Sequence, residues 1–242
     1  MGYSVVRDFV VDDRDMRLQS SGVGTPVLLL HELAGNARTF LPVVEPLIAT
    51  GREVVALDLP GHGHSSAVPG SDLDGNAWAV AGALDEVTAE PMDIVGVDYG
   101  GFLALSIAAL FPSRVRSLVV VEPLAPPAAG RAPSSIVPVA QRARGALTVL
   151  RQGRHGLGRM HSVLDQLRTA DPIWWKGLAN ITCPTLLVDG GHGHAANLVD
   201  LDTMADTIPD AKRVSLTTGA RPWIAAPQLF ADVVTSFLAD VH

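Results

Sequence analysis

Short, continuous apolar runs alternate along this chain with longer stretches of helical periodicity. Continuous apolar runs are typical of strands that are covered on both faces. Their alternation with helices is the pattern of a parallel sheet with crossover helices. Residues 3–22 differ, because there the pattern indicates an initial antiparallel pair of strands. The strands expected in the parallel sheet are Val27–His31, Glu53–Asp58, Asp93–Val97, Leu118–Val121, Thr185–Val188 and Arg213–Leu216.

The alternation weakens between Glu122 and Cys183, because prolines crowd the first part and glycines interrupt the middle. We expect residues of about 124–177 to form a small, mainly helical cap beside the carboxyl ends of the strands, where open α/β sheets bind ligands. No linker divides the chain, so residues 1–242 are expected to form one α/β domain. The predicted helices are Ala77–Ala89, Gly100–Phe111 and Ile224–Ala239.

Composition limits the classes of partner and compartment. The chain has 242 residues, 48% of them hydrophobic, and a mean hydropathy of +0.27, which is enough for a large core. A net charge of −7 argues against nucleic acid as a partner. The single cysteine, Cys183, allows no internal disulfide and fits a reducing compartment. We find no signal-peptide pattern and no membrane-length apolar run, so we expect a cytoplasmic, bacterial protein.

A sharp turn from strand to helix is predicted at Gly96-Val97-Asp98-Tyr99-Gly100. The spacing is that of the G-x-S-x-G nucleophile elbow, with Asp98 in the place of the serine. The flanking glycines allow a strained backbone that lifts the central side chain clear of the sheet. A carboxylate cannot do what a serine does, so this substitution changes the chemistry that the turn supports.

Four further segments extend the pattern in a fixed order. They are Leu28–Gly35, Ala56–Ser65, Cys183–Gly190 and Gly219–Pro227. With the elbow, they resemble the loops after strands 3 and 4, strand 7, and the histidine-bearing segment of the α/β-hydrolase superfamily. The resemblance covers nearly the whole chain and implies a mostly parallel sheet flanked by helices. Fold alone does not determine function.

Carried over residue by residue, the catalytic triad of that superfamily is absent. The nucleophile position holds Asp98, the acid position aligns with Gly193, and the histidine position aligns with Ala220. The amides of Tyr99 and Leu33 match the two donors of the oxyanion hole. Glu32 replaces the glycine after His31, which puts a side chain into a tight loop.

An aspartate at the elbow resembles the haloalkane dehalogenases and epoxide hydrolases of this superfamily. Their carboxylate attacks carbon, and a histidine then activates the water that cleaves the ester. With Ala220 in the histidine position, that cycle stalls after one turnover. His192 and His194 flank the lost acid and offer a relocated base, or they are solvated residues of a polar loop. No third ligand is placed by spacing, so we expect no metal site and no cofactor.

Several further side chains are candidates for substrate binding. Glu122 ends a strand and matches an acid position of some dehalogenases, or it lies at the surface. His31 supports the oxyanion loop in this superfamily, and Glu32 adjoins it. Trp174 and Trp223 line an aromatic pocket or pack in the core. An acyl carrier protein is a candidate partner for the basic cap residues Arg142, Arg144, Arg151, Arg154, Arg159 and Arg168.

These residues favour a biosynthetic enzyme that transfers an acyl group from an ester or thioester to an acceptor other than water. Asp98 with His194 or His192 would act as the base, and the Tyr99 and Leu33 amides would hold the oxyanion. Three alternatives stay open. They are proton-transfer chemistry (an epimerase, cyclase or lyase), a catalytically inactive ligand- or partner-binding protein, and a hydrolase with a relocated histidine.

Overall fold

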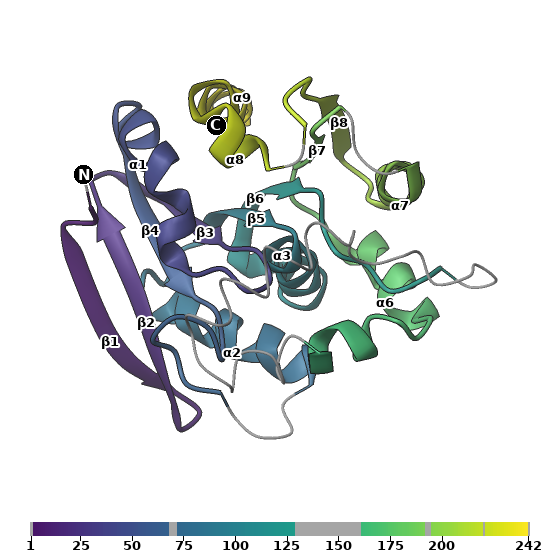
Figure 1. Ribbon diagram of the computed structural model, residues 1–242, viewed down its shortest axis with the longest axis horizontal. Helices are drawn as coiled ribbons and strands as arrows, with labels where there is room; N and C mark the ends of the chain where they lie inside the picture. Colours follow the sequence, from purple (N-terminus) through teal and green to yellow (C-terminus); the bar gives the residue numbers. More distant parts are fainter. Residues whose placement is uncertain (1, 68–71, 129–160, 192–194, 220, 242) are drawn as a thin grey trace.

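The structure, a computed structural model, describes residues 2–67, 72–128, 161–191, 195–219 and 221–241. The strands in these residues are β1 Val5–Val11, β2 Arg14–Ser21, β3 Thr25–Leu30, β4 Arg52–Asp58, β5 Met92–Val97, β6 Val115–Val121, β7 Thr185–Asp189 and β8 Ala211–Ser215. They form an eight-stranded sheet in the order β1-β2-β4-β3-β5-β6-β7-β8 (Figure 1). β2 pairs antiparallel with β1 and β4, and the remaining pairs are parallel. The predicted α/β class and the initial antiparallel pair are both confirmed.

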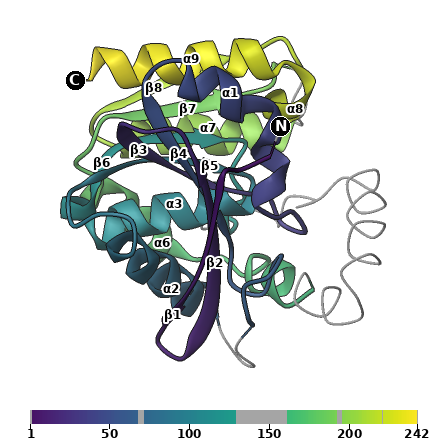
Figure 2. The ribbon, with the colours of Figure 1, turned by 90° about the vertical axis from the view of Figure 1, so that its left-hand side faces the viewer.

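Helices cover both faces of the sheet. Their bounds are α1 Leu41–Ile48, α2 Leu73–Asp85, α3 Tyr99–Leu110, α6 Pro172–Gly177, α7 Ala195–Thr207, α8 Pro222–Ala225 and α9 Pro227–Asp240. Short 3₁₀ turns lie at Ala37–Phe40, Pro112–Arg114 and Leu178–Asn180. Figure 2 shows α1, α8 and α9 on one side of the sheet, and α2, α3 and α6 on the other.

The two hydrophobic cores explain why the strands read as continuous apolar runs. In β3, Val27 and Leu29 pack into the core beneath α1 and α9. Leu28 and Leu30 point the other way, into the core beneath α2 and α3. Successive side chains of a strand alternate between faces, so a strand buried on both sides needs an apolar residue at every position.

The helices differ from the sequence prediction in four places. α1 was not predicted, because Pro42 and Pro46 interrupt its pattern, although Pro42 lies in the first turn, where a missing N–H costs nothing. α2 begins at Leu73, four residues early, because the Asp72 carboxylate caps it by accepting the Gly75 N–H. The third helix is divided at Pro227 into α8 and α9. α7 was also not predicted, since acidic residues leave it a weak apolar stripe.

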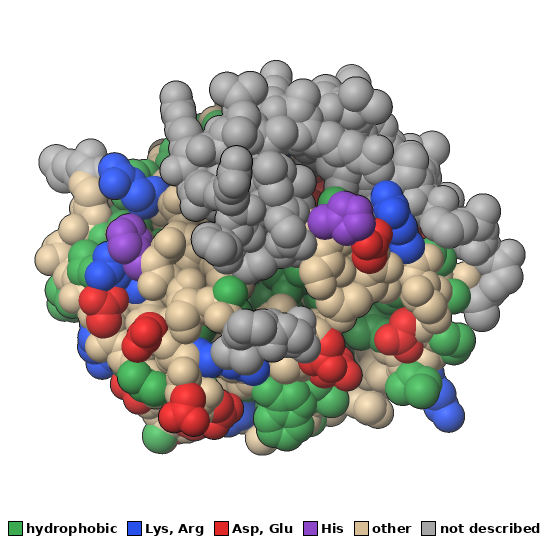
Figure 3. Space-filling model, turned by 60° about the horizontal axis from the view of Figure 1, so that its bottom comes forward, with side chains coloured by type: hydrophobic (Ala, Val, Ile, Leu, Met, Phe, Trp, Pro, Cys, Tyr) green, Lys and Arg blue, Asp and Glu red, His purple; other side chains and the backbone are tan. Residues whose placement is uncertain are grey.

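Only the two ends of the predicted cap, residues 124–128 and 161–177, lie within the described residues. The second end contains α6 and a helical segment at 161–166. The cap as a whole stays a prediction. Of its arginines, Arg168 pairs with Asp165 at 2.9 Å, and the other five lie outside the described residues. Figure 3 shows acidic side chains scattered over one face of the molecule, with Lys and Arg side chains beside several of them. Within the described part of the chain, no helix is both long and apolar enough to cross a membrane.

Candidate active site

The turn between β5 and α3 holds Asp98 in a strained backbone conformation. Its φ of 53° and ψ of −115° lie in a region of backbone conformation that residues other than glycine rarely adopt. Backbone hydrogen bonds hold it there: the Asp98 N–H donates to Val121 O at 2.9 Å, and Asp98 O accepts from Leu124 N at 3.0 Å. A Cβ on Gly100 would overlap the Leu30 carbonyl oxygen. Glycine is therefore required where the elbow crosses β3.

The Asp98 carboxylate contacts one of the two amides expected to form the oxyanion hole. Leu33 donates its N–H to Asp98 Oδ2 at 2.9 Å. The structure therefore brings together Asp98, Leu33 and Tyr99 as the sequence predicts. However, the Leu33 donor is already used by Asp98 itself, so it is not open to a substrate oxygen in this arrangement.

The surroundings of Asp98 make its carboxyl group a weak acid. Burial raises the pKa of Asp98 to about 7, against the lowering effect of the Leu33 hydrogen bond and of the Tyr99 amide. The negative charges of Glu32 and Glu122 raise the pKa of Asp98 further. Both protonation states are therefore populated near neutral pH, which is the condition that suits a general acid or base.

Glu32 turns its side chain back across the loop that follows β3. Its Oε1 accepts a hydrogen bond from Thr39 Oγ1 at 2.9 Å and forms an ion pair with Arg221 Nη2. A Cβ on Gly35 would lie 2.8 Å from Glu32 Oε2, so Gly35 makes room for this side chain. The tight loop therefore accommodates the carboxylate that replaced the superfamily glycine.

Arg221 is not among the site residues predicted from the sequence. It immediately precedes α8 with a left-handed φ of 64°, and its guanidinium lies over the Trp223 ring, 5.8 Å from the centroid. A signal was present in the sequence. Glu32 and Arg221 are opposite charges at two segments that depart from the superfamily pattern, one at the lost glycine and one beside the lost histidine.

Glu122 lies at the carboxyl end of β6 and faces the β7 loop. Its Oε1 accepts the Gly190 N–H at 3.1 Å, and its own N–H donates to Val188 O at 3.0 Å. It also has a left-handed φ of 44°. Glu122 thus joins the ends of two neighbouring strands while its charge acts on Asp98.

His31 and the two tryptophans take supporting positions. His31 is fully buried, and it braces the loops because Nδ1 donates to Glu32 O at 2.8 Å while Nε2 accepts from Leu59 N at 3.0 Å. Burial lowers the pKa of His31 to about 4, so the ring is neutral. Trp223 is 1% exposed, and Trp174 stacks on Phe102 with ring centroids 5.3 Å apart. These positions fit the core-packing alternative for both tryptophans.

The relocated base predicted from the sequence is His192 or His194. His192 and His194, like Gly193 and Ala220, lie outside the described residues, so a histidine partner for Asp98 stays a prediction. Among the residues that are described, no group of three or more His, Cys, Asp or Glu side chains is arranged to hold a metal ion.

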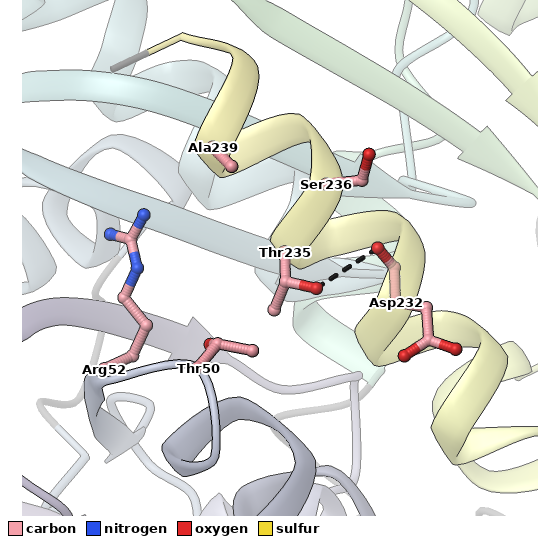
Figure 4. A pocket seen from close by; sticks show the side chains of 6 residues that line it. All are labelled: Thr50, Arg52, Asp232, Thr235, Ser236 and Ala239. Atoms are coloured by element: carbon pink, nitrogen blue, oxygen red, sulfur yellow. Dashed lines mark hydrogen bonds between the residues drawn. The ribbon is translucent and has the colours of Figure 1, made fainter.

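A polar groove lies at the opposite end of the sheet, where β4 begins rather than where strands end. It has a volume of about 350 Å³ and is bounded by α9 and the turn before β4 (Figure 4). Arg52 in this groove already forms an ion pair with the buried Asp93. Thr235 Oγ1 donates to Asp232 O at 3.2 Å. The groove is therefore separate from the Asp98 site. Its lining is Thr50, Arg52, Asp232, Thr235, Ser236 and Ala239.

Two relatives match part of the chain in sequence. Over 99 residues, the chain is 38% identical to a dihydrolipoyllysine-residue acetyltransferase component of an acetoin cleaving system from Pseudomonas putida, covering 40% of the chain and 26% of the relative. Over 119 residues, it is 30% identical to a 2-hydroxymuconate semialdehyde hydrolase from Pseudomonas sp. (strain CF600), covering 48% and 42%. The chain thus spans less than half the length of these relatives.

The fold is shared more widely than the sequence. The structure of a bacterial membrane phospholipase A superimposes with a TM-score of 0.82 at 21% identity, covering 98% of this chain and 86% of that one. The family model described as the alpha/beta hydrolase fold matches residues 25–156, more than half of the chain. The chain, with an aspartate at its elbow, therefore belongs to the α/β-hydrolase family.

Proposed function

We propose that this chain is an α/β-hydrolase-fold enzyme in which Asp98 moves a proton on a bound substrate. The supporting observation is the position of its carboxylate, which the Leu33 amide holds through Oδ2 at 2.9 Å. An ionised carboxylate has about four acceptor sites, and among the described residues the Leu33 amide uses one of them. Asp98 is thus fixed in place and keeps acceptor sites for a substrate proton.

The same contacts favour proton transfer over the acyl transfer expected from the sequence. Acyl transfer develops a negative charge on the substrate carbonyl oxygen, and preorganised donors must be open to receive it. The Leu33 amide instead donates to Asp98. A substrate carbonyl would first have to displace the carboxylate from this hydrogen bond. Epimerisation, cyclisation or a lyase reaction makes no such demand on the Leu33 amide.

The proton affinity of Asp98 suits this chemistry. A catalytic base works best when its pKa is close to the working pH, and the pKa of Asp98 is about 7, chiefly because of burial. In its ionised form Asp98 takes a proton from an acidic C–H or O–H group of the substrate. In its protonated form it returns the proton to the product. The reaction thereby needs no covalent intermediate on the chain.

Acyl transfer is the second candidate. One relative is named as an acetyltransferase component, although that relative is matched over only 26% of its length. In this scheme the Asp98 side chain leaves the Leu33 amide, which then holds the oxyanion with the Tyr99 amide, while Asp98 with His194 or His192 deprotonates the acceptor. The acyl carrier protein proposed for the basic cap belongs to this candidate alone.

The discriminating experiment follows both proton exchange and acyl transfer in the same samples. The purified chain is incubated in D₂O at pH 7 with carbonyl compounds that carry acidic C–H groups, as free acids and as N-acetylcysteamine thioesters. NMR measures deuterium uptake at carbon, and mass spectrometry measures transfer to an added amine. Generic p-nitrophenyl esters test for hydrolysis by a relocated histidine.

Asp98→Asn should slow exchange by about 100-fold or more, because an amide cannot take the proton. Asp85→Asn is the matched control, since Asp85 is an exposed acid paired with Arg114 and should leave the rate unchanged. Transfer to the amine without exchange would support the second candidate instead. Equal exchange by wild type and Asp98→Asn would refute the proposal. Binding without any chemistry would identify a ligand-binding protein.

A further inference from the structure

An ion pair joins the loop after β3 to the residue immediately preceding α8. Glu32 comes from the first segment and Arg221 from the second, 189 residues later in the chain. Glu32 is largely buried, at 14% side-chain exposure, and Arg221 is 33% exposed. Thr39 Oγ1 shares the same Glu32 oxygen at 2.9 Å. Arg221 therefore compensates a carboxylate that has little access to water.

The ionic link is a single contact. Glu32 Oε2 and Arg221 Nε are both buried and have no hydrogen-bond partner among the described residues. The connection between the two side chains therefore runs through Glu32 Oε1 and Arg221 Nη2. Arg221 Nη2 also donates to Thr39 Oγ1 at 3.5 Å, and Thr39 Oγ1 in turn donates to Glu32 Oε1. Both links start at the Arg221 guanidinium, so one substitution at Arg221 breaks them.

The loop that Arg221 holds also carries the amide that anchors Asp98. Leu33 follows Glu32 directly and donates its N–H to Asp98 Oδ2. The Glu32 carbonyl oxygen accepts the Gly35 N–H at 2.9 Å and the His31 Nδ1–H at 2.8 Å. Side chain and backbone of Glu32 are thus both tied, and a shift of Glu32 moves the peptide group that presents the Leu33 N–H.

We propose that Arg221 is a positioning residue for the Asp98 site: by holding Glu32, it keeps the Leu33 amide on the Asp98 carboxylate and offsets the Glu32 charge beside it. The inference rests on the proposed function for its catalytic meaning. Its physical content concerns only the proton affinity of Asp98 and the Leu33 hydrogen bond. The charged groups that act on Asp98 in the described part of the chain are Glu32 and Glu122.

Arg221→Met tests the proposal, because methionine keeps much of the side-chain length and removes the charge. The full chain is labelled with ¹³C at aspartate carboxyl carbons and with ¹⁵N, and the Asp98 signal is assigned as the one lost in Asp98→Asn. In the wild type, the chemical shift of the Leu33 amide should change with pH at the pKa of Asp98. In Arg221→Met, the pKa of Asp98 should rise by about one unit, because the Glu32 charge is uncompensated. The chemical shift of the Leu33 amide should then no longer change with the protonation of Asp98.

Two variants separate positioning from general damage. Arg221→Lys restores the charge and should return the Asp98 titration most of the way to wild type. Arg213→Met removes an arginine of similar exposure that pairs with Asp189 and Asp202, and it should leave both signals unchanged. The proposal would be overturned if the pKa of Asp98 in Arg221→Met equalled that of the wild type. It would also be overturned if Arg213→Met shifted this pKa by the same amount.

Glu32→Gln provides an independent test if Arg221→Met does not fold. Glutamine keeps an oxygen for Thr39 and Arg221 but removes the charge. The pKa of Asp98 should therefore fall while the Leu33 amide continues to titrate, and an unchanged or raised pKa would contradict the proposal. Failure of the proposed function would look different, since deuterium exchange would be absent while these titrations stayed measurable.

Discussion

Replacing Asp98 by asparagine should stabilise the fold, and the gain should grow with pH. The folded chain raises the pKa of Asp98 from 3.8 to about 7, mainly through burial. Between these values the folded chain keeps a proton that the unfolded chain has released. Stability from this group is therefore complete at low pH, falls as pH rises from about 4 to 7, and is constant above that range. Asparagine has no charge to bury, so Asp98→Asn escapes the loss.

The size of the effect follows from the shift. Each pKa unit corresponds to about 1.4 kcal/mol, so a change from 3.8 to about 7 gives roughly 4 kcal/mol at pH 8. Asp98 is partly exposed, and screening by solvent makes this an upper value. For a chain of 242 residues, a difference of that size corresponds to roughly 8–16 °C in Tm.

Urea unfolding at a series of pH values from 4 to 8 measures the difference. The four tryptophans provide the fluorescence signal, and wild type and Asp98→Asn are compared at each pH. All other titrating groups are shared by the two proteins, so their contributions largely cancel. A stability difference that does not change between pH 4 and pH 8 would refute the reasoning, because Asp98 would then have an ordinary pKa in the folded chain.

The remaining predictions concern the frame around the site. Asp93→Asn should have the opposite effect and destabilise the chain by about 3–5 kcal/mol at pH 7, because it leaves Arg52 and Arg116 without their buried carboxylate. Burial raises the pKa of Asp93, but hydrogen bonds from Arg116 and Ser117 and the Arg52 charge outweigh it and lower the pKa. The loss should thus shrink as acid protonates Asp93, and urea curves at pH 7 and pH 3 check it. Gly100→Ala should cost about 3 kcal/mol or more, because the added Cβ overlaps the Leu30 carbonyl. Gly177→Ala is its control, since no atom lies within 4 Å of the added Cβ, and equal Tm values for the two variants would contradict the steric argument.

The strands were predictable because their signal is local. β3 is apolar at Val27, Leu28, Leu29 and Leu30 alike, and no solvent-facing position interrupts the run. α1 was hidden because its prolines look like helix breakers, and only the structure shows that Pro42 occupies the first turn. Local signals of this kind place elements well but place their ends poorly, as the early start of α2 shows.

The candidate site divides in the same way. The elbow could be predicted, since Gly96 and Gly100 lie at fixed spacing around Asp98. The hydrogen bond from the Leu33 N–H to Asp98 Oδ2 could not be predicted, because the two residues lie 65 positions apart in the sequence. Their distance is set only by the folded chain. Arg221 was missed for the same reason, since its partner Glu32 belongs to a distant segment.

The position of the Asp98 carboxylate also determines the order in which ester hydrolysis could be restored by protein engineering. A histidine installed at Ala220 alone would leave the Asp98 carboxylate bonded to the Leu33 amide and would add no hydroxyl nucleophile. Asp98→Ser has to come first, because it frees the Leu33 N–H and supplies a hydroxyl in one step. The Leu33–Asp98 hydrogen bond therefore makes the hydroxyl, rather than the histidine, the first group to install.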